Sequence, residues 1–109
     1  MKIAILLLCH CAPKQINALT EAMSHPSITF FVHVDKKADI VKDIHTSERV
    51  TLMPESDRVD VRWGQVSQLD ATLKLMQYAS RGSAYDFYWL CSGQDFPIKS
   101  ISMIVRRFE

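Results

Sequence analysis

The chain contains four apolar runs, and each has the length of a β-strand. None of the runs contains Asp, Glu, Lys or Arg, and strands without polar alternation are typical of parallel sheets that are covered on both faces. The four runs are Ile3–Cys9, Ile28–Val34, Val50–Met53 and Phe87–Cys91. The pattern predicts four strands of a mostly parallel sheet.

Segments of helical character separate these runs. Pro13 suits the first turn of a helix, and apolar residues follow it at helical spacing until His25-Pro26 breaks the pattern. A short helix is expected over Ala38–His45. The clearest amphipathic helix starts near Gly64, and a last helix starts near Ser100. We expect the apolar face of the clearest helix to consist of Val66, Leu69, Leu73 and Met76.

Strands that alternate with helices predict an α/β fold with a mostly parallel sheet. Right-handed crossovers favour the spatial strand order 3-2-1-4. In such sheets ligands bind beyond the carboxyl ends of the strands, at the point where the order reverses. Four segments should meet there, namely Cys9–Ala12, Asp35–Lys37, the loop that ends at Trp63, and Ser92–Asp95.

Asp35 is the most informative single residue, because it follows the second strand directly. A carboxylate there can accept hydrogen bonds from a ribose or a base. It can equally cap the helix that follows, and the pattern leaves both interpretations open. The turn His10-Cys11-Ala12-Pro13 lacks the glycines of a dinucleotide or P-loop site, which disfavours a simple NAD or ATP enzyme such as a reductase.

Other residues near the strand ends have a structural and a functional interpretation. Trp63 could lie beside a ligand or pack under the following helix, and packing is the favoured interpretation. Gly93 permits a close backbone approach, and Asp95 could contact a sugar or cap a turn. His33, in the middle of its strand, is interpreted as a core histidine with its hydrogen bonds satisfied.

Composition narrows the range of partners and cofactors. The 109 residues carry a formal charge of +1, which gives no broad field for nucleic acid or acidic membranes. The three cysteines, Cys9, Cys11 and Cys91, do not suggest a disulfide framework. A strand would place Cys9 and Cys11 on one face and His10 on the other, so we expect buried thiols and no metal site. No apolar run approaches the ~20 residues of a membrane span.

Several segments together resemble the Core-2/I-branching glycosyltransferases, a family that includes peptide O-xylosyltransferases. The segments, in the order of that family, are IAILLLCHCAP at 3–13, FFVHVDKK at 30–37, RVDVRWGQVSQLDATLKLM at 58–76 and YWLCSGQDFPIKS at 88–100. HVDKK and SGQDFPIK are the most specific parts. The resemblance covers nearly the whole chain.

The resemblance implies a GT-A type fold, a UDP-sugar donor and transfer with inversion to a glycan or protein hydroxyl. It also implies that basic side chains, and no metal or other cofactor, neutralise the leaving diphosphate. The sequence agrees, since no two aspartates occur in Asp-x-Asp spacing. The sugar would be N-acetylglucosamine or xylose. In the family the catalytic carboxylate and the basic residues lie beyond this region, so we expect no catalytic residue within 1–109.

Carried over to this chain, the resemblance assigns donor-binding roles at each strand end. Asp35 would contact the uridine, and Asp60 lies at a loop position that faces the nucleotide in relatives, where an aspartate in place of an aromatic residue weakens the assignment. Lys36, Lys37 and Lys99 are expected to face solvent. The donor-binding set is Leu7, Cys9, His10, Asp35, Asp60, Trp63, Gly93, Gln94 and Asp95.

The expected organisation is one domain over residues 1–109, which is the nucleotide-sugar-binding, Rossmann-like part of a glycosyltransferase truncated before its catalytic half. The alternative is a non-catalytic nucleotide-binding or assembly module with the same fold. The fourth strand should be an apolar edge with Phe87, Trp89 and Leu90 short of cover, so self-association is expected. We expect a cytoplasmic location, peripheral to a membrane if the protein acts where glycans are built.

Overall fold

The computed structural model describes residues 2–61, 66–82, 84–92 and 101–108. Four parallel strands form one sheet in the order β3-β2-β1-β4. Their bounds are β1 Ile3–Cys9, β2 Ile28–Val34, β3 Val50–Leu52 and β4 Phe87–Ser92. The predicted α/β class and strand order are confirmed.

In the described residues two α-helices and two short 3-10 turns connect the strands, and a third α-helix follows β4. They are α1 Pro13–Ala22, η1 Val41–Asp43, η2 Glu55–Asp57, α2 Val66–Gly82 and α3 Ile101–Phe108. The helix expected over Ala38–His45 is therefore only the turn η1. The loop that follows β3 contains η2.

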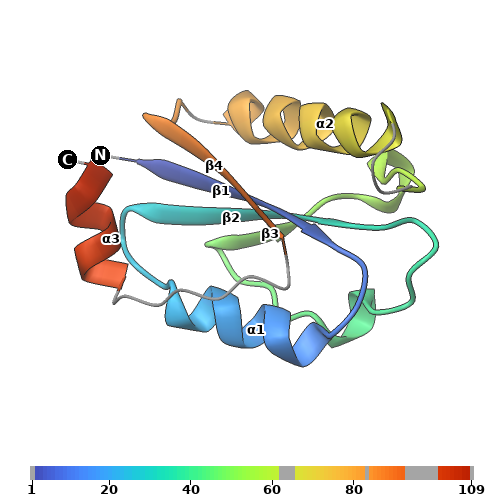
Figure 1. Ribbon diagram of the computed structural model, residues 1–109, viewed down its shortest axis with the longest axis horizontal. Helices are drawn as coiled ribbons and strands as arrows, with labels where there is room; N and C mark the ends of the chain where they lie inside the picture. Colours follow the sequence, from blue (N-terminus) through green and yellow to red (C-terminus); the bar gives the residue numbers. More distant parts are fainter. Residues whose placement is uncertain (1, 62–65, 83, 93–100, 109) are drawn as a thin grey trace.

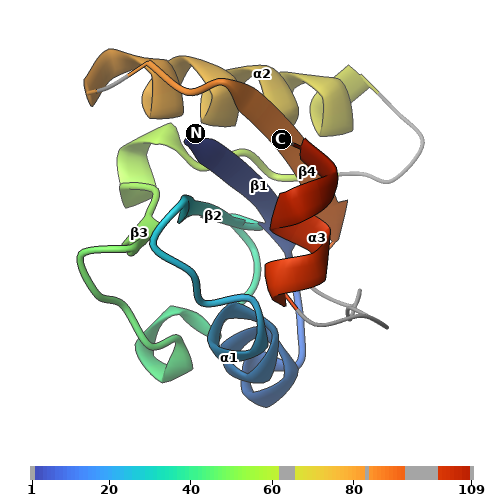
Figure 2. The same ribbon diagram turned by 90° about the vertical axis from the view of Figure 1, so that its left-hand side faces the viewer.

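The helices lie in two layers, one on each face of the sheet. α1 and α3 lie on one face and α2 covers the other (Figures 1 and 2). On the α1 face the core contains alternate residues of β1 and β2, such as Ile5 and Val32, packed with Ile16 and Leu19 of α1. β1 is buried along its whole length because helices cover both of its faces.

The buried face of α2 differs from the expected one. Ala71, Leu75 and Ala79 pack on the sheet with Leu6 and Phe31. The residues that we expected to face the core, Leu69, Leu73 and Met76, are exposed by 58%, 49% and 40%. The helical period was correct, but the sheet-facing side consists largely of alanines, whose small side chains weigh little in a hydrophobic pattern.

The turn between β1 and α1 contains one unusual backbone conformation. Ala12, the residue before Pro13, has φ 57° and ψ 60°, which is the left-handed region. Non-glycine residues pay about 1–2 kcal/mol there. Pro13 at the first helical position then fixes the direction of α1. The glycine-free turn noted in the sequence is thus made by a strained alanine at the carboxyl end of β1.

Candidate functional site

The carboxyl ends of β1 and β2 meet at Asp35, the residue that follows β2. Its backbone N–H donates to the carbonyl oxygen of Cys9 at 2.8 Å, which joins the two strand ends. The Asp35 side chain is only 3% exposed. A carboxylate is rarely buried to this extent unless it is paired, so its partners define the site.

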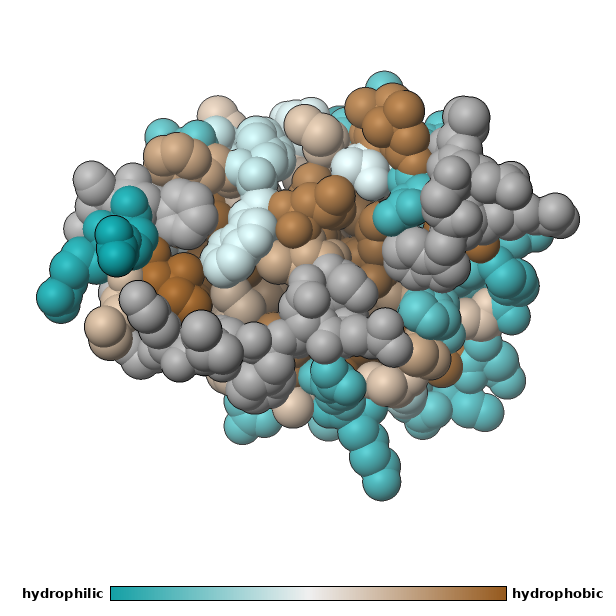
Figure 3. Space-filling view, in the orientation of Figure 1, coloured by the Kyte–Doolittle hydropathy of each residue, from teal (hydrophilic) through white to brown (hydrophobic). Residues whose placement is uncertain are grey.

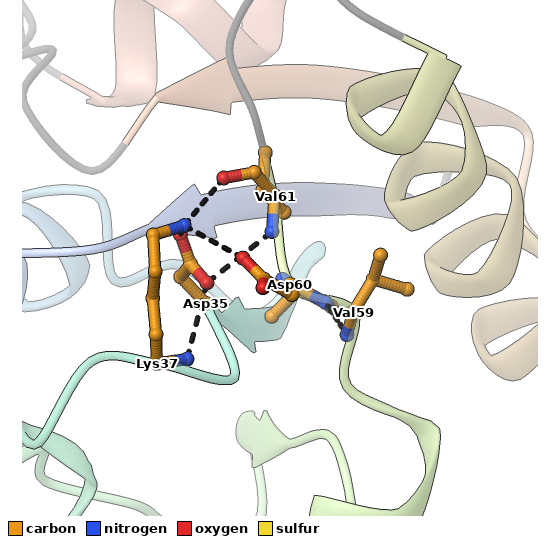
Figure 4. Close-up of polar contacts among 6 residues, drawn as sticks. Asp35, Lys37, Val59, Asp60 and Val61 are labelled. Carbon is orange, nitrogen blue, oxygen red and sulfur yellow. Dashed lines mark hydrogen bonds and ion pairs between the residues drawn. The ribbon is translucent and has the colours of Figure 1, made fainter.

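Three donors hold the Asp35 carboxylate (Figure 4). Oδ1 accepts hydrogen bonds from the backbone N–H groups of Lys37 at 3.2 Å and Val61 at 3.3 Å, and Oδ2 accepts one from the Lys37 ammonium at 2.6 Å. Asp35 therefore shapes a turn in its own loop and reaches the loop after β3. It does not cap a helix, because the residue that precedes η1 is Ile40.

Lys37 connects the two loops through its ammonium group. Nζ donates to Asp35, to Oδ1 of Asp60 at 3.0 Å and to the carbonyl oxygen of Val61 at 2.5 Å. The Lys37 side chain is 57% exposed and the Asp60 side chain is 53% exposed. Lys37 is thus largely exposed, as expected, and its ammonium also links the two loops.

The electrostatics of this pair follow from burial and hydrogen bonding. Burial alone would raise the pKa of the Asp35 carboxyl, but the hydrogen bonds from Lys37 and Val61 outweigh it and lower that pKa. The hydrogen bonds to Asp35 and Asp60 raise the pKa of Lys37. At neutral pH the site thus contains the ionised Asp35 carboxylate, paired with the charged Lys37 ammonium.

His33 of β2 also binds the loop after β3, through a hydrogen bond to Val59. Its ring is fully buried, and Nε2 accepts a hydrogen bond from the backbone N–H of Val59 at 2.9 Å. Burial lowers the pKa of His33, so the neutral form with the proton on Nδ1 is the consistent assignment. Nδ1 is buried and has no hydrogen-bond partner among the described residues, so within that part of the chain the expected satisfied core histidine is satisfied at one nitrogen. The backbone N–H of Lys36 adds a hydrogen bond to the carbonyl oxygen of Val59 at 3.1 Å.

The remaining predicted site residues lie at different depths. Leu7 and Cys9 are buried in the core on the α1 face, and His10 is half-buried just past β1. Burial, assisted by the nearby Cys11, raises the pKa of the Cys9 thiol to about 12. Trp63, Gly93, Gln94 and Asp95 lie outside the described residues, as does Lys99.

Sequence reasoning missed the role of Lys37 and of the HVDKK segment as a whole. Residues 33 to 37 are hydrogen-bonded to residues 59 to 61 through the contacts above. A single short motif therefore positions both the loop after β2 and the loop after β3. The signal available was the unusual pairing of a strand-end aspartate with a lysine two residues later. The partner loop, more than twenty residues away in sequence, could not be located from spacing alone.

The structure also has hollows elsewhere on its surface. One of about 380 Å³ lies between α1 and the amino end of β3 and is lined by Asn17, His45 and Arg49, among others. It includes none of the predicted site residues. Within the described ranges, no three His, Cys, Asp or Glu side chains gather where they could hold a metal ion. None of the described helices combines the length and apolarity needed to cross a membrane.

Comparison with known proteins gives this site a family context. Residues 3–109 match the family of Core-2/I-Branching enzymes. Xylosyltransferase 2 of Canis lupus familiaris and that of Homo sapiens are each 30% identical to this chain over 115 residues. The match covers 96% of this chain and 13% of each xylosyltransferase. The parallel sheet with helices on both faces is consistent with a GT-A type glycosyltransferase fold. The chain belongs to the Core-2/I-branching enzyme family.

Proposed function

We propose that this chain forms the UDP-sugar-binding part of a glycosyltransferase. The whole enzyme would be an inverting, metal-independent transferase that moves N-acetylglucosamine or xylose to a glycan or protein hydroxyl. The observation that carries this proposal is the position of Asp35, a buried, ionised carboxylate at the carboxyl edge of the sheet beside β1. Strands are added in opposite directions on the two sides of β1, and ligands of open α/β sheets bind at such points.

The Asp35 carboxylate retains capacity for a ligand. Two carboxylate oxygens offer about four acceptor positions, and three donors occupy three of them in this structure. The remaining position is on Oδ2, which the Lys37 ammonium covers. A ribose hydroxyl or a base N–H can reach it when the exposed Lys37 side chain moves aside. The site can therefore accept a donor group from a nucleoside without losing its backbone hydrogen bonds.

Titration calorimetry with UDP tests this proposal. We expect Asp35→Ala to weaken UDP binding by ~1–3 kcal/mol, the usual cost of leaving polar groups unpaired. Asp39→Ala is the matched control, since it removes an exposed carboxylate from the same loop. Asp35→Asn keeps an oxygen that can accept from Val61, so it separates loss of charge from loss of loop structure. Equal UDP affinity in all four proteins would remove Asp35 from the site.

The alternative is a non-catalytic nucleotide-binding or assembly module with the same fold, and one observation favours its assembly form. The charge of Asp35 is already compensated within the chain, and its hydrogen bonds hold a loop. If that is its whole role, Asp35→Ala lowers thermal stability while UDP produces no heat of binding with the wild type. UDP binding by the wild type that is weaker in Asp35→Asn excludes this purely structural role.

We also propose that β4, which lies last in the sheet formed by the described strands, allows self-association. Phe87 and Leu90 are exposed by 40% and 50%, and Trp89 is half-buried, in agreement with the expected lack of cover. Phe87–Ser92 contains no charged residue and no proline, the features that protect natural sheet edges. Sedimentation velocity over a range of concentrations tests it, and a single monomeric species throughout would contradict it.

A further inference from the structure

The His33 imidazole lies in the apolar layer between the sheet and α2. Leu8, its register partner on β1, and Phe31, two residues earlier on β2, both belong to the core beneath α2, and strand geometry points His33 to the same face. Apolar side chains also reach the surface on the side where α2 lies, over the helix and beneath it (Figure 3). The ring itself is fully buried. A polar ring in such surroundings costs free energy unless its nitrogens are hydrogen-bonded.

The direction of one hydrogen bond fixes the protonation state that this ring needs. The backbone N–H of Val59 donates to Nε2 of His33 at 2.9 Å, and a backbone N–H can only donate. Nε2 must therefore offer its lone pair, which leaves the proton on Nδ1. A doubly protonated ring would turn a second N–H toward the N–H of Val59, and two donors cannot form a hydrogen bond. The contact between β2 and the loop after β3 thus exists only while His33 is neutral.

Val59 is the first residue of the loop segment that completes the Asp35 site. Two residues later, the backbone N–H of Val61 donates to Asp35 at 3.3 Å, and the carbonyl oxygen of Val61 accepts from the Lys37 ammonium (Figure 4). Asp35 and Lys37 keep their charges at mildly acidic pH, because the pKa of the first is lowered and that of the second is raised. Among the side chains in these contacts, His33 is therefore the one whose charge a mild fall in pH can change.

The groups around the ring together oppose a positive charge on it. Burial lowers the pKa of His33 below its ordinary value, and the positive charges of Arg58 in the loop and Lys74 on α2 act in the same direction. Asp35 acts in the opposite direction but is outweighed. β1 contributes Leu8, which carries no charge. The neutral ring thus stabilises the loop contact fully above the ordinary histidine pKa of about 6.5, and this contribution declines as the pH falls below that value.

We propose that His33 is a positioning residue of the UDP site, an inference that rests on the proposed function above. Its neutral imidazole holds residues 59–61 in the conformation that completes the site at Asp35, and protonation of the ring releases them. UDP binds the conformation with the loop in place, so its apparent affinity falls with the fraction of molecules that hold it. Because His33 is fully buried, it acts through the backbone of Val59 and does not touch the nucleotide.

Amide hydrogen exchange of Val59 in the full chain tests the loop contact without any ligand. The measured quantity is the protection factor, which is the intrinsic exchange rate divided by the observed rate, near pH 7.5 and near pH 5.5. We expect protection in the wild type to fall by up to about tenfold over this range, because opening of the loop lets His33 take up a proton. His33→Gln offers an amide oxygen to the Val59 N–H and cannot titrate, so its protection should be equal at both pH values.

Binding of UDP by the same proteins tests the role of His33 in the site. His33→Leu removes the acceptor for the Val59 N–H and should raise the dissociation constant for UDP about tenfold at neutral pH, whereas His33→Gln should restore it to within about twofold of the wild type. The matched control is His25→Leu, because Nδ1 of His25 accepts the backbone N–H of Ser27 at 3.0 Å near the other end of β2. The control should change neither the dissociation constant nor the protection of Val59.

Equal pH dependence of Val59 protection in the wild type and His33→Gln would overturn the proposal, as would UDP binding by His33→Leu as tight as that of the wild type. If His33→Leu does not fold, the pH dependence of exchange in the wild type and His33→Gln decides. Absence of UDP binding by all of these proteins, together with the expected exchange, would refute the proposed function and confirm that His33 holds the loop.

Discussion

At Asp35, burial and hydrogen bonding act on one carboxyl in opposite directions. Desolvation favours the neutral acid, while three donors, one of them charged, favour the anion, and the anion prevails. The outcome depends on Lys37, whose ammonium binds Oδ2 at 2.6 Å. Lys37 therefore helps to keep Asp35 ionised, and in the proposed function it would also control access to Oδ2.

Replacing Lys37 with methionine should raise the pKa of Asp35, because burial would then be opposed by the two backbone N–H groups alone. The pKa is measured by carbon NMR of the side-chain carboxyl. Lys36→Met is the control, since Lys36 contacts the neighbouring loop through its backbone N–H. An unchanged Asp35 pKa in Lys37→Met would show that the ammonium does not determine the ionisation.

The same variant should change how stability depends on pH. The lowered pKa of Asp35 stabilises the folded state above the unfolded-state pKa of about 3.9, and this contribution is lost as the pH falls through the folded pKa. Urea unfolding at neutral pH and near pH 3 should therefore give a larger difference in stability between wild type and Lys37→Met at neutral pH. A difference that is independent of pH would contradict the assignment.

Cys9 should be chemically inert in the folded chain. Burial raises the pKa of its thiol to about 12, so the reactive thiolate is scarce at pH 8, and the residue is only 3% exposed. Iodoacetamide followed by mass spectrometry should leave Cys9 unmodified until urea is added. Alkylation of Cys9 at equal rates in the folded and unfolded chain would show that the end of β1 opens readily.

Among the elements, the β1–α1 turn offers the clearest test of local strain. Ala12→Gly removes the left-handed penalty of about 1–2 kcal/mol but adds about 0.5–1 kcal/mol of unfolded-state entropy. We expect a net stabilisation of about 0.5–1 kcal/mol by urea unfolding. Ala18→Gly, at an exposed position inside α1, is the control and should destabilise by a similar amount. Destabilisation by both changes would mean that the turn is not strained.

The strands were predictable because their sequences are apolar without interruption. The predicted runs Ile3–Cys9 and Ile28–Val34 have the same bounds as β1 and β2 in the structure. The helix face of α2 was not predictable in the same way. Two stripes share its period, and the sheet-facing one contains Ala71 and Ala79, whereas the exposed one contains larger apolar residues. Burial there follows from how closely the helix approaches the sheet, which hydropathy does not record.

For the molecule as a whole, the handedness of the crossovers was enough to order the sheet and to bring Asp35 to the end of β1. The side-chain contacts within the site were less predictable. Asp35 was identified from its place after a strand and Asp60 from the family resemblance, but the link that the Lys37 ammonium forms between them was not predicted. A lysine shared by two carboxylates depends on loop geometry, and loop geometry depends on His33 and Val59.

UDP binding by this chain should not require a divalent metal. The sequence contains no Asp-x-Asp pair, and the Asp35 and Asp60 carboxylates share the Lys37 ammonium, which occupies the place where a cation would bind between them. A UDP titration in EDTA should therefore give the same dissociation constant as one in manganese. Lys37→Met is the informative second protein, because two carboxylates without their ammonium form a better cation site. If EDTA abolished binding by the wild type and manganese restored it, the metal-independent assignment would be wrong. If manganese strengthened binding in Lys37→Met alone, the lysine would be acting in place of the metal.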